Sequence, residues 1–479
     1  MRRLKIALLS SFSVAGAAIF SPVAAEAAPS LTSEQQENVD RLIERALADD
    51  TAYQVLESLT TEVGPRLAAT EAEARARDWG VSKFKALGFK KARIETYEMP
   101  SWSRISESAE IVSPFPQKLV VTALGNSVST PKGGLSGEVV RFETLTELQR
   151  APMHGLEGKI VFVDEKMTRT QDGSGYGVAV AKRSGAANEA SKRGAAASVI
   201  RSVGTDSHRN PHTGVMRYED GITPIPIAAL SNPDADQLAR ALALSGGAPV
   251  VVSLDLQTNK VDAAQSGNVI GEIEGESDEL IVVGGHIDSW DLGPGVIDDG
   301  AGIAITMAAA KLVGELRGKP ARTIRVVMWG AEEVGLYGAK AYAAAHADEI
   351  DRHVLAAESD FGAGRIYQMR TRFGEGMLPK AQPFFDALRP LGVGPGSNEA
   401  FGGADVSPLR AAGVPVLDLA QDGTDYFDLH HTPDDTLDKV DPDALRQNVA
   451  AWAVMIYLAS ETPGGFRNPA PAAQTEAAN

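Results

Sequence analysis

Cysteine is absent from the 479-residue chain. No disulfide can therefore stabilise the protein, and no thiolate can act as a nucleophile or as a zinc ligand. A lipid cannot be attached to a cysteine near the amino terminus either. Any metal ion that the protein binds must be held by histidine, aspartate and glutamate alone.

Positive charge and long apolar runs are also scarce. The net charge of −17 opposes binding to nucleic acid, because the backbone phosphates would be repelled, and it is ordinary for a soluble protein. Beyond the amino terminus no segment reaches ~18 uninterrupted apolar residues, the length that crosses a bilayer. We therefore expect no nucleic-acid partner and no membrane span after the amino-terminal segment is removed.

The amino terminus carries the pattern of a secretory signal. A basic start over residues 1–5 is followed by apolar residues 6–20 and by the small-x-small sequence Ala25-Glu26-Ala27. This pattern predicts a signal peptide over residues 1–27 that is cut off during export, so the mature protein would be periplasmic or secreted. An uncleaved membrane anchor is the alternative, which the serines and glycine within the apolar stretch disfavour.

The length of the chain indicates two domains, since a single core stops growing at roughly 250–300 residues. Short β-like runs dominate the middle of the chain, which predicts a separate β-rich module inserted into the main domain; a continuous single fold is the alternative. The predicted parts are a main domain formed by residues 28–113 and 266–462, an inserted domain over residues 114–265, and a disordered tail, rich in Pro, Ala and Gly, over residues 463–479.

After Asn268 the chain alternates between strands and helices. The apolar runs Leu280–Val283 and Thr323–Trp329 are predicted as strands, and the helical spacing over Gly302–Leu316 predicts a helix between them. Such alternation is typical of an α/β fold with a mostly parallel, mixed sheet and helices on both faces. Ligands of such sheets bind beyond the carboxyl ends of the strands.

Five clusters of histidines and carboxylates are expected at those strand ends or in the loops beyond. They are His286-Ile287-Asp288, Asp298-Asp299-Gly300, Glu332-Glu333, Glu358-Ser359-Asp360 and His430-His431-Thr432-Pro433-Asp434. Each cluster alone has a plain structural explanation, such as a core histidine, a helix cap or a solvated loop. Three of the 8 histidines fall in them, and their convergence predicts a metal-dependent hydrolytic site.

The residue types assign roles only in part. His286 and Asp288 lie two positions apart in a strand, so the Asp288 side chain can hold the second ring nitrogen of His286. Neighbouring side chains in an extended segment diverge. One of Glu332 and Glu333 can therefore bind a metal while the other acts as a general base towards a water. The chemistry alone does not decide between the two glutamates.

The order and intervals of these clusters resemble the binuclear zinc exopeptidases related to aminopeptidases and to carboxypeptidase Q. The best local matches are His286–Gly302 and Trp329–Gly335, and Gly64-Pro65-Arg66-Leu67 is similar to a short element near the amino end of that family. The resemblance extends over roughly Ala46–Ala459. It implies the zinc exopeptidase fold, which is phosphorylase/hydrolase-like, and the inserted module resembles a protease-associated domain.

The resemblance also implies a role for each site residue and two Zn²⁺ per subunit. Five side chains would bind the metal ions, as two pairs and a bridge: His286 with Asp360, Glu333 with His431, and Asp298 between them. Asp298 would be joined to Asp299 by a cis peptide bond, and Asp288 would orient His286. Glu332 would be the general base for a hydroxide shared by the two metal ions.

The implied substrates are dipeptides or short peptides, and a general aminopeptidase is the alternative. Tyr426 and Phe427, near His431, are candidates for lining the substrate pocket, although ordinary core aromatics are an equal expectation. The inserted module would cover the active site and limit substrate length, and a homodimer is implied by the carboxypeptidase Q type. A non-catalytic binding protein and a one-zinc glutaminyl cyclase share the fold, but the complete ligand set with Asp298 favours the exopeptidase.

Overall fold

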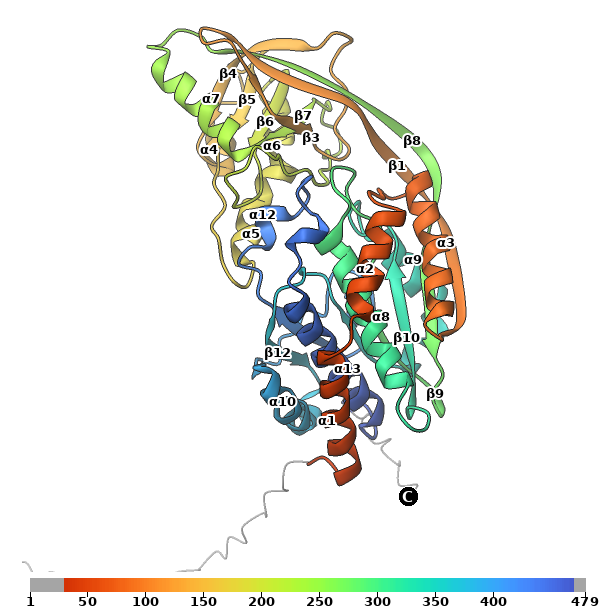
Figure 1. Cartoon of the computed structure of the whole chain (residues 1–479). Coiled ribbons are helices and arrows are strands. Elements are labelled where there is room, and N and C mark those ends of the chain that lie inside the picture. Colours follow the sequence, from red (N-terminus) through yellow and green to blue (C-terminus); the bar gives the residue numbers. More distant parts are fainter. Residues whose placement is uncertain (1–29, 469–479) are drawn as a thin grey trace, which may run out of the picture.

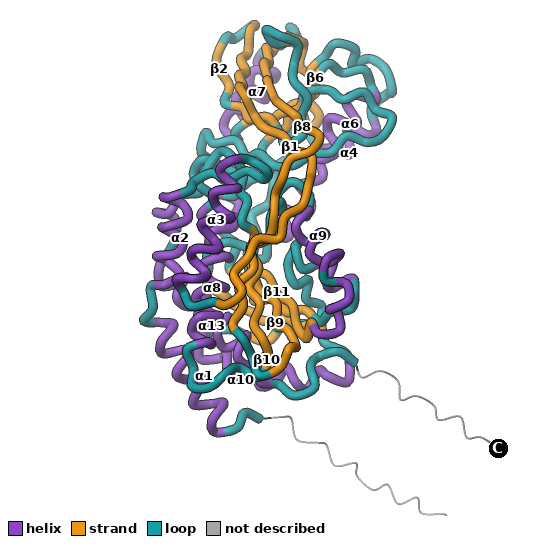
Figure 2. The backbone as a smooth tube through the Cα atoms, turned by 90° about the vertical axis from the view of Figure 1, so that its right-hand side faces the viewer, coloured by secondary structure: helices purple, strands orange, loops and turns teal. Residues whose placement is uncertain are grey.

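The computed structural model describes residues 30–468. The predicted signal peptide and residues 469–479 of the predicted tail lie outside this part. None of the helices between residues 30 and 468 combines the length and apolar character that a bilayer crossing needs. The described chain forms a larger and a smaller lobe joined by a long two-stranded ribbon (Figures 1 and 2).

The larger lobe contains the predicted α/β fold. Its strands lie in the order β13-β12-β14-β11-β9-β10-β8. Strands β9, β10, β11 and β14 run parallel to one another, whereas β8 and β12 are antiparallel to their neighbours β10 and β14. The helices are α1 (Ser33–Leu47), α2 (Thr51–Glu62), α3 (Glu71–Ala86), α8 (Ala301–Gly314), α9 (Tyr337–Ala345), α10 (Gln382–Leu388), α11 (Ser407–Ala411), α12 (Tyr426–Leu429) and α13 (Pro442–Glu461). The strands are β8 (Val251–Ile273), β9 (Ser277–His286), β10 (Arg322–Trp329), β11 (His353–Glu358), β12 (Ile366–Arg372), β13 (Gly394–Pro395) and β14 (Val416–Gln421).

Helices cover both faces of this sheet because the central strands are apolar on both sides. In β9, Ile281 and Val283 pack into the core that contains α8 and α13, whereas Leu280 and Val282 pack into the core that contains α9 and α11. Successive strand residues point to opposite faces, so one continuous apolar run supplies two cores. Figure 2 shows α2, α3, α8 and α13 on one side of the strands and α9 on the other.

The ribbon consists of β1 (Lys90–Ser113) and β8, which have 24 and 23 residues. They pair antiparallel from Lys90 opposite Glu272 to Ser113 opposite Val251. One end of β8 pairs with β10 in the larger lobe, and the other end pairs with β4 (Leu135–Phe142) in the smaller lobe. The ribbon therefore carries the sheet from one lobe into the other.

The smaller lobe lies within the predicted inserted segment. Strands β4 to β7 are parallel and β3 adds antiparallel to β7. Its remaining strands are β2 (Gln117–Leu119), β3 (Val121–Ala123), β5 (Ile160–Val163), β6 (Ala197–Arg201) and β7 (Ile227–Leu230), and its helices are α4 (Leu145–Arg150), α5 (Ser174–Ala179), α6 (Ala181–Lys192) and α7 (Asn232–Leu244). The module is thus itself a mixed α/β unit rather than mainly β. Its apolar side chains form two cores, one of which also contains Leu67 and Trp290 of the larger lobe.

The start of the predicted disordered tail is packed onto the larger lobe. Phe466 is fully buried and stacks on Phe373 with ring centroids 4.3 Å apart. Arg467 donates a hydrogen bond of 2.7 Å to the carbonyl of Ile350. The prediction of disorder from Pro463 onward is therefore wrong for residues 463–468, because an aromatic residue in that Pro- and Gly-rich segment finds a place in the core.

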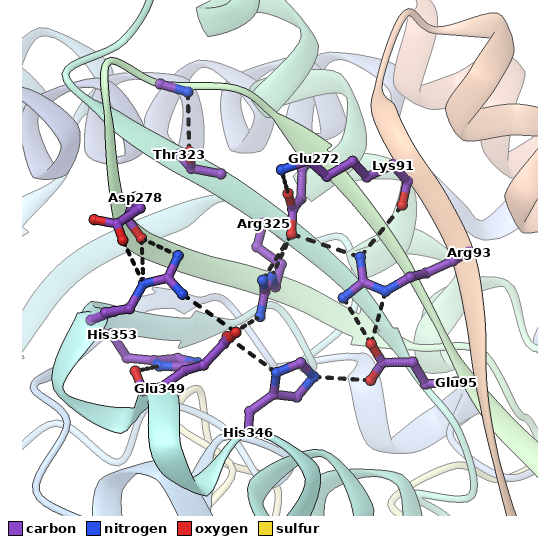
Figure 3. Close-up of polar contacts among 12 residues, drawn as sticks. Lys91, Arg93, Glu95, Glu272, Asp278, Thr323, Arg325, His346, Glu349 and His353 are labelled. Carbon is purple, nitrogen blue, oxygen red and sulfur yellow. Dashed lines mark hydrogen bonds and ion pairs between the residues drawn. The ribbon is translucent and has the colours of Figure 1, made fainter.

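An ion-pair network lies near the amino ends of β9 and β10, at the edge of the sheet away from the clusters. Arg325 pairs with Glu272 at 2.8 Å and with Glu349 at 3.4 Å (Figure 3). His346 lies between Glu349 and Glu95, at 3.2 and 3.0 Å. The network connects β1, β8, β10 and the segment after α9, so it reinforces the lobe.

Candidate metal centre

The structure gathers all five predicted clusters at the carboxyl edge of the parallel strands. His286 is the last residue of β9, and Glu332 and Asp360 follow the ends of β10 and β11 by a few residues. Asp298 lies in the short turn Val296–Gly300, directly before α8, and its peptide bond to Asp299 is cis, as expected. Parallel strands end at the same edge of a sheet, which explains the convergence.

The first half of the centre is formed by His286, Asp298 and Asp360. The Nε2 atom of His286 lies 3.0 Å from Oδ1 of Asp298 and 3.5 Å from Oδ1 of Asp360. His286 and Asp298 are buried, with side chains 1% and 4% exposed. One imidazole nitrogen and two carboxylate oxygens thus converge on a single point.

The second half is formed by the other oxygen of Asp298. Its Oδ2 atom lies 3.2 Å from Nε2 of His431, and the same nitrogen lies 2.9 Å from Oε2 of Glu333. His431 adopts a left-handed backbone with φ of 64°, an uncommon conformation for a residue with a side chain. Asp298 therefore faces a histidine with each of its two oxygens.

These residues fit metal ions better than they fit one another. Oδ2 of Asp298 and Oε1 of Glu333 are buried without a hydrogen-bond donor among the described residues, which is costly for a carboxylate unless a cation is bound. Groups of three potential ligands lie close together around both His286 and His431. Imidazole and carboxylate donors without sulfur suit Zn²⁺.

Protonation in the centre follows its burial and its pairing. Burial alone would raise the pKa of Asp298, but the neighbouring imidazoles of His286 and His431 hold that pKa well below its ordinary value. Burial raises the pKa of Glu332 well above its ordinary value, although the nearby His286 opposes the shift; the negative charges of neighbouring carboxylates add to it. Asp298 is thus kept charged, while Glu332 has an increased affinity for a proton.

The two adjacent glutamates have different environments. Glu333 points to His431 with its side chain only 4% exposed, whereas Glu332 is partly exposed and lines a pocket. The backbone N–H groups of both donate to the carboxylate of Asp288, at 3.0 Å from Glu332 and 3.3 Å from Glu333. Asp288 therefore fixes the turn that separates the two side chains.

Asp288 also orients His286, but through its main chain. Nδ1 of His286 lies 2.8 Å from the backbone carbonyl of Asp288 and 3.8 Å from its carboxylate. Donation to the carbonyl leaves Nε2 of His286 free to face Asp298 and Asp360. The sequence had suggested the carboxylate for this task, and the turn after β9 explains the difference, because that carboxylate is used by the two glutamate N–H groups.

A second layer of polar residues positions the loop that carries Asp298. The carboxylate of Asp435 accepts from the backbone N–H groups of Ile297 and Asp298, at 2.7 and 3.3 Å. The fully buried Arg66 donates to four main-chain carbonyls, those of Ile287 at 2.5 Å, of residues 294 and 295 at 2.6 and 2.9 Å, and of residue 64 at 3.3 Å. Through these hydrogen bonds, the Gly64-Pro65-Arg66-Leu67 element supports the loop that carries Asp298.

Sequence reasoning missed the contribution of the inserted lobe. Nδ1 of His431 lies 3.2 Å from the carbonyl of Thr213. Nδ1 of His212 lies 2.6 Å from the carbonyl of His430, and Nε2 of His212 lies 2.7 Å from the carboxylate of Asp206. The sequence carries no signal for these contacts, because two of them use main-chain carbonyls.

Beside the centre lies a pocket of about 390 Å³ that both lobes line. The smaller lobe contributes Tyr176, Arg183 and Val215, and the larger lobe contributes the site residues and an apolar part. The candidates Tyr426 and Phe427 do line the pocket, and both also belong to the core of the larger lobe. The module therefore lines part of the pocket, and that it covers the site and limits substrate length stays a prediction.

Comparison with known proteins places this geometry in a family. The model of "Peptidase family M28" matches residues 268–456. Carboxypeptidase Q from Mus musculus is 33% identical over 415 residues, an alignment that covers 86% of each chain. The chain belongs to peptidase family M28. It is accordingly a metallo-exopeptidase, as the clusters and their order predicted.

Solved structures agree with this assignment. A peptidase M28 precursor from Shewanella amazonensis is 48% identical and has a TM-score of 0.88, with 91% of this chain and 99% of that chain covered. An aminopeptidase from Aneurinibacillus sp. strain AM-1 is 21% identical, with a TM-score of 0.60 and coverage of 90% and 100%. The zinc aminopeptidase BSAP from Bacillus subtilis is 18% identical, with a TM-score of 0.61 and coverage of 85% and 94%. The last two similarities show a common fold.

Proposed function

We propose that this M28 peptidase is an exported exopeptidase that uses two Zn²⁺ ions to hydrolyse dipeptides or short peptides. The observation that carries the proposal is the position of Asp298, which presents one carboxylate oxygen to His286 and the other to His431, at 3.0 and 3.2 Å. A carboxylate shared in this way is what a pair of neighbouring cations requires.

The five predicted ligands would hold the two ions as a matched pair of sites. His286 and Asp360 would bind the first ion, Glu333 and His431 would bind the second, and Asp298 would bind both. When bound, the ions would lower the pKa of a shared water and polarise the scissile carbonyl. Both histidines have Nδ1 close to a main-chain carbonyl, at 2.8 and 3.2 Å, which supports metal binding through Nε2.

Glu332 would act as the general base. It lies next to a metal ligand, it lines the pocket, and its carboxylate is not used by the turn that Asp288 holds. It would accept a proton from the attacking water and then donate that proton to the leaving amine, while Asp288 keeps it in place. A raised pKa suits both halves of this transfer, because a group that is too acidic would not take the proton.

Small peptides are the proposed substrates because the pocket is small and the inserted lobe bounds one side of it. A volume of about 390 Å³ is near the lower end of the roughly 300–1,000 Å³ typical of small-molecule sites. The inserted lobe, which we propose is a protease-associated domain, closes it on one side. The runner-up is a general aminopeptidase, the activity named for the Aneurinibacillus protein of similar fold.

Two further parts of the proposal concern location and assembly. The pattern over residues 1–27 supports export to the periplasm or beyond the cell. Similarity to carboxypeptidase Q supports a homodimer. Amino-terminal sequencing of the mature protein and light scattering would test these two points separately.

Hydrolysis of a peptide panel tests the proposed activity. Purified protein would be treated with a chelator, restored with Zn²⁺, and given a dipeptide and a hexapeptide that share their amino-terminal residue. We expect the dipeptide to be cleaved far faster, and only after zinc is restored. Equal cleavage of both peptides would favour the general aminopeptidase. No cleavage by zinc-loaded protein would overturn the proposal in favour of a binding protein.

A further inference from the structure

The inserted lobe places one arginine beside the metal centre. Arg183 lies in α6, is buried, and lines the 390 Å³ pocket. The acidic residues that line the same pocket are Asp298, Glu332, Glu333 and Asp360. Among the described residues that line this pocket, Arg183 is the one lysine or arginine, and its charge is permanent. It is therefore the pocket's fixed site for a negatively charged group.

The guanidinium of Arg183 lacks the partner that buried arginines normally have. Its Nη1 atom lies 3.4 Å from the carbonyl of Thr213 and 3.4 Å from Nδ1 of His431, and its Nη2 atom donates to the hydroxyl of Tyr176. Its Nε atom is buried without an acceptor. Across residues 30–468 no carboxylate forms an ion pair with Arg183. A buried cation with only neutral partners is costly unless an anion completes the site.

Arg325 in the larger lobe shows the ordinary alternative. It is also buried, but it pairs with Glu272 at 2.8 Å and with Glu349 at 3.4 Å (Figure 3). Every charge of that network has an opposite charge beside it, which is typical of a structural role. Arg183 has no opposite charge beside it, and it lines a pocket instead of lying within a network of ion pairs.

The position of the Arg183 guanidinium is fixed by its neighbours. It lies over the ring of Tyr176, 5.5 Å from the ring centroid, and Tyr176 stacks on Phe427 at 4.8 Å. Gly214 has a φ of 137°, and a Cβ atom there would come within 2.1 Å of Nη1 of Arg183. A glycine at this position therefore leaves the space that the guanidinium fills.

We propose that Arg183 binds the free carboxylate of the leaving amino acid, and that it thereby selects substrates whose scissile bond is the last one of the peptide. This inference rests on the proposed function and names its substrate class. Nε2 of His431 faces Asp298 and Glu333, and Nδ1 of the same ring lies 3.4 Å from Nη1 of Arg183. The imidazole ring therefore lies between the metal side and the guanidinium, on the side to which the leaving residue of a dipeptide would extend.

Arginine is well suited to this role. Its planar fork can donate two parallel hydrogen bonds to a carboxylate. An amide in place of that carboxylate would leave the buried charge unpaired, so a site built for the acid rejects the amide strongly. The same contact would disfavour substrates that continue beyond the leaving residue.

Kinetics on a matched pair of substrates tests the proposal. A dipeptide and its carboxyl-terminal amide would be compared for the wild type, Arg183→Gln, Arg183→Lys and the control Arg150→Gln, which alters an exposed arginine of the same lobe. We expect kcat/KM for the acid to fall about 100-fold in Arg183→Gln, to fall less in Arg183→Lys, and to be unchanged in the control. Values for the amide should change little. Equal losses for acid and amide would overturn the proposal, as would a wild type that cleaves both equally well.

Binding without turnover separates this inference from the proposed function. In zinc-loaded Glu332→Gln protein, calorimetry should show the dipeptide acid binding at least about 10-fold more tightly than the amide, and added Arg183→Gln should remove that difference. Equal binding of acid and amide would contradict the Arg183 proposal even if the wild type is an active peptidase. A retained difference in a protein without peptidase activity would contradict the proposed function alone. Zinc content should be the same in all variants.

Discussion

Thr213 and His431 hold each other at two points across the two lobes. The backbone N–H of Thr213 donates to the carbonyl of His431 at 3.1 Å, and the carbonyl of Thr213 lies 3.2 Å from Nδ1 of the His431 ring. His431 is a proposed metal ligand, and its ring nitrogens have fixed tasks once Nδ1 donates to this carbonyl. The inserted lobe thus holds a proposed metal ligand in place and also lines the pocket.

His212→Ala tests this link between the lobes. His212 connects the carboxylate of Asp206 to the carbonyl of His430, both buried, at 2.7 and 2.6 Å. We expect its loss to weaken zinc binding by about 10–100-fold and to lower the free energy of unfolding by about 1–3 kcal/mol, because Asp206 loses a buried partner. Titration of zinc against a competing chelator and urea unfolding measure the two effects.

The control for this experiment is His154→Ala. The side chain of His154 is 93% exposed, so this variant should leave both zinc affinity and stability unchanged. If His212→Ala bound zinc as tightly as the wild type, the module would not support the metal centre in the way we describe.

Substitution of the paired glutamates separates base from ligand. Glu332→Gln should retain the full zinc content and lose nearly all turnover, a fall of about 100- to 10,000-fold as expected for a general base. Glu333→Gln should lose zinc as well, because its carboxylate faces His431 at 2.9 Å. Elemental analysis and steady-state kinetics on both variants decide the matter, and near-native turnover by zinc-loaded Glu332→Gln would refute its role.

Arg66→Lys tests the support beneath the Asp298 loop. Arg66 is fully buried and its guanidinium donates to the carbonyls of Ile287, Pro294 and Gly295. A lysine keeps the charge but cannot reach three separate acceptors with the geometry of a planar fork. We expect the free energy of unfolding to fall by roughly 2–4 kcal/mol, so that the variant unfolds at a lower urea concentration. We also expect it to bind zinc more weakly. The control is Arg446→Lys, because Arg446 is partly exposed and pairs with Asp50 and Asp443 far from the site. Equal effects of the two changes would contradict the assignment.

Acid should destabilise the protein through His353. Burial lowers the pKa of His353 to about 4, and its Nδ1 lies 2.9 Å from the carbonyl of Glu349 (Figure 3). The unfolded chain takes up a proton near pH 6.5 whereas the folded one resists until about pH 4, so stability is lost as pH falls through that window. From pH 7 to 4.5 this group should contribute a loss of about 2 kcal/mol.

The variant His353→Asn isolates this contribution, since an asparagine can still donate to the carbonyl of Glu349. Urea unfolding at pH 7 and 4.5 should show a smaller acid loss in the variant than in the wild type. His154→Asn, at an exposed position, should lose as much as the wild type. An identical acid loss in all three proteins would show that His353 is not the group responsible.

Much of the larger lobe could be predicted from its pattern, and its missed parts have physical reasons. The apolar runs of β9 and β10 and the helix α8 between them are read directly from their spacing. Helix α13 was not predicted, because it is buried over most of its length, from Ala444 to Ser460, and shows no polar stripe. The length of the β1–β8 ribbon was missed because its middle is exposed and alternates weakly.

The site was predictable where its chemistry lies in side chains at strand ends. His286, Asp298 and Glu333 stand out because their residue types and order are rare together. The contacts from Thr213 and Arg183 could not be predicted, since one uses only the main chain and the other is a single arginine in a different lobe. Assembly of two lobes, rather than local sequence, creates that half of the pocket.

The central claim is that two metal ions flank Asp298. Anomalous diffraction at the zinc absorption edge, from crystals of the zinc-restored protein, tests it most directly. We predict two peaks of similar height, one between His286 and Asp360 and the other between Glu333 and His431. A single peak, or none within reach of Asp298, would contradict the account.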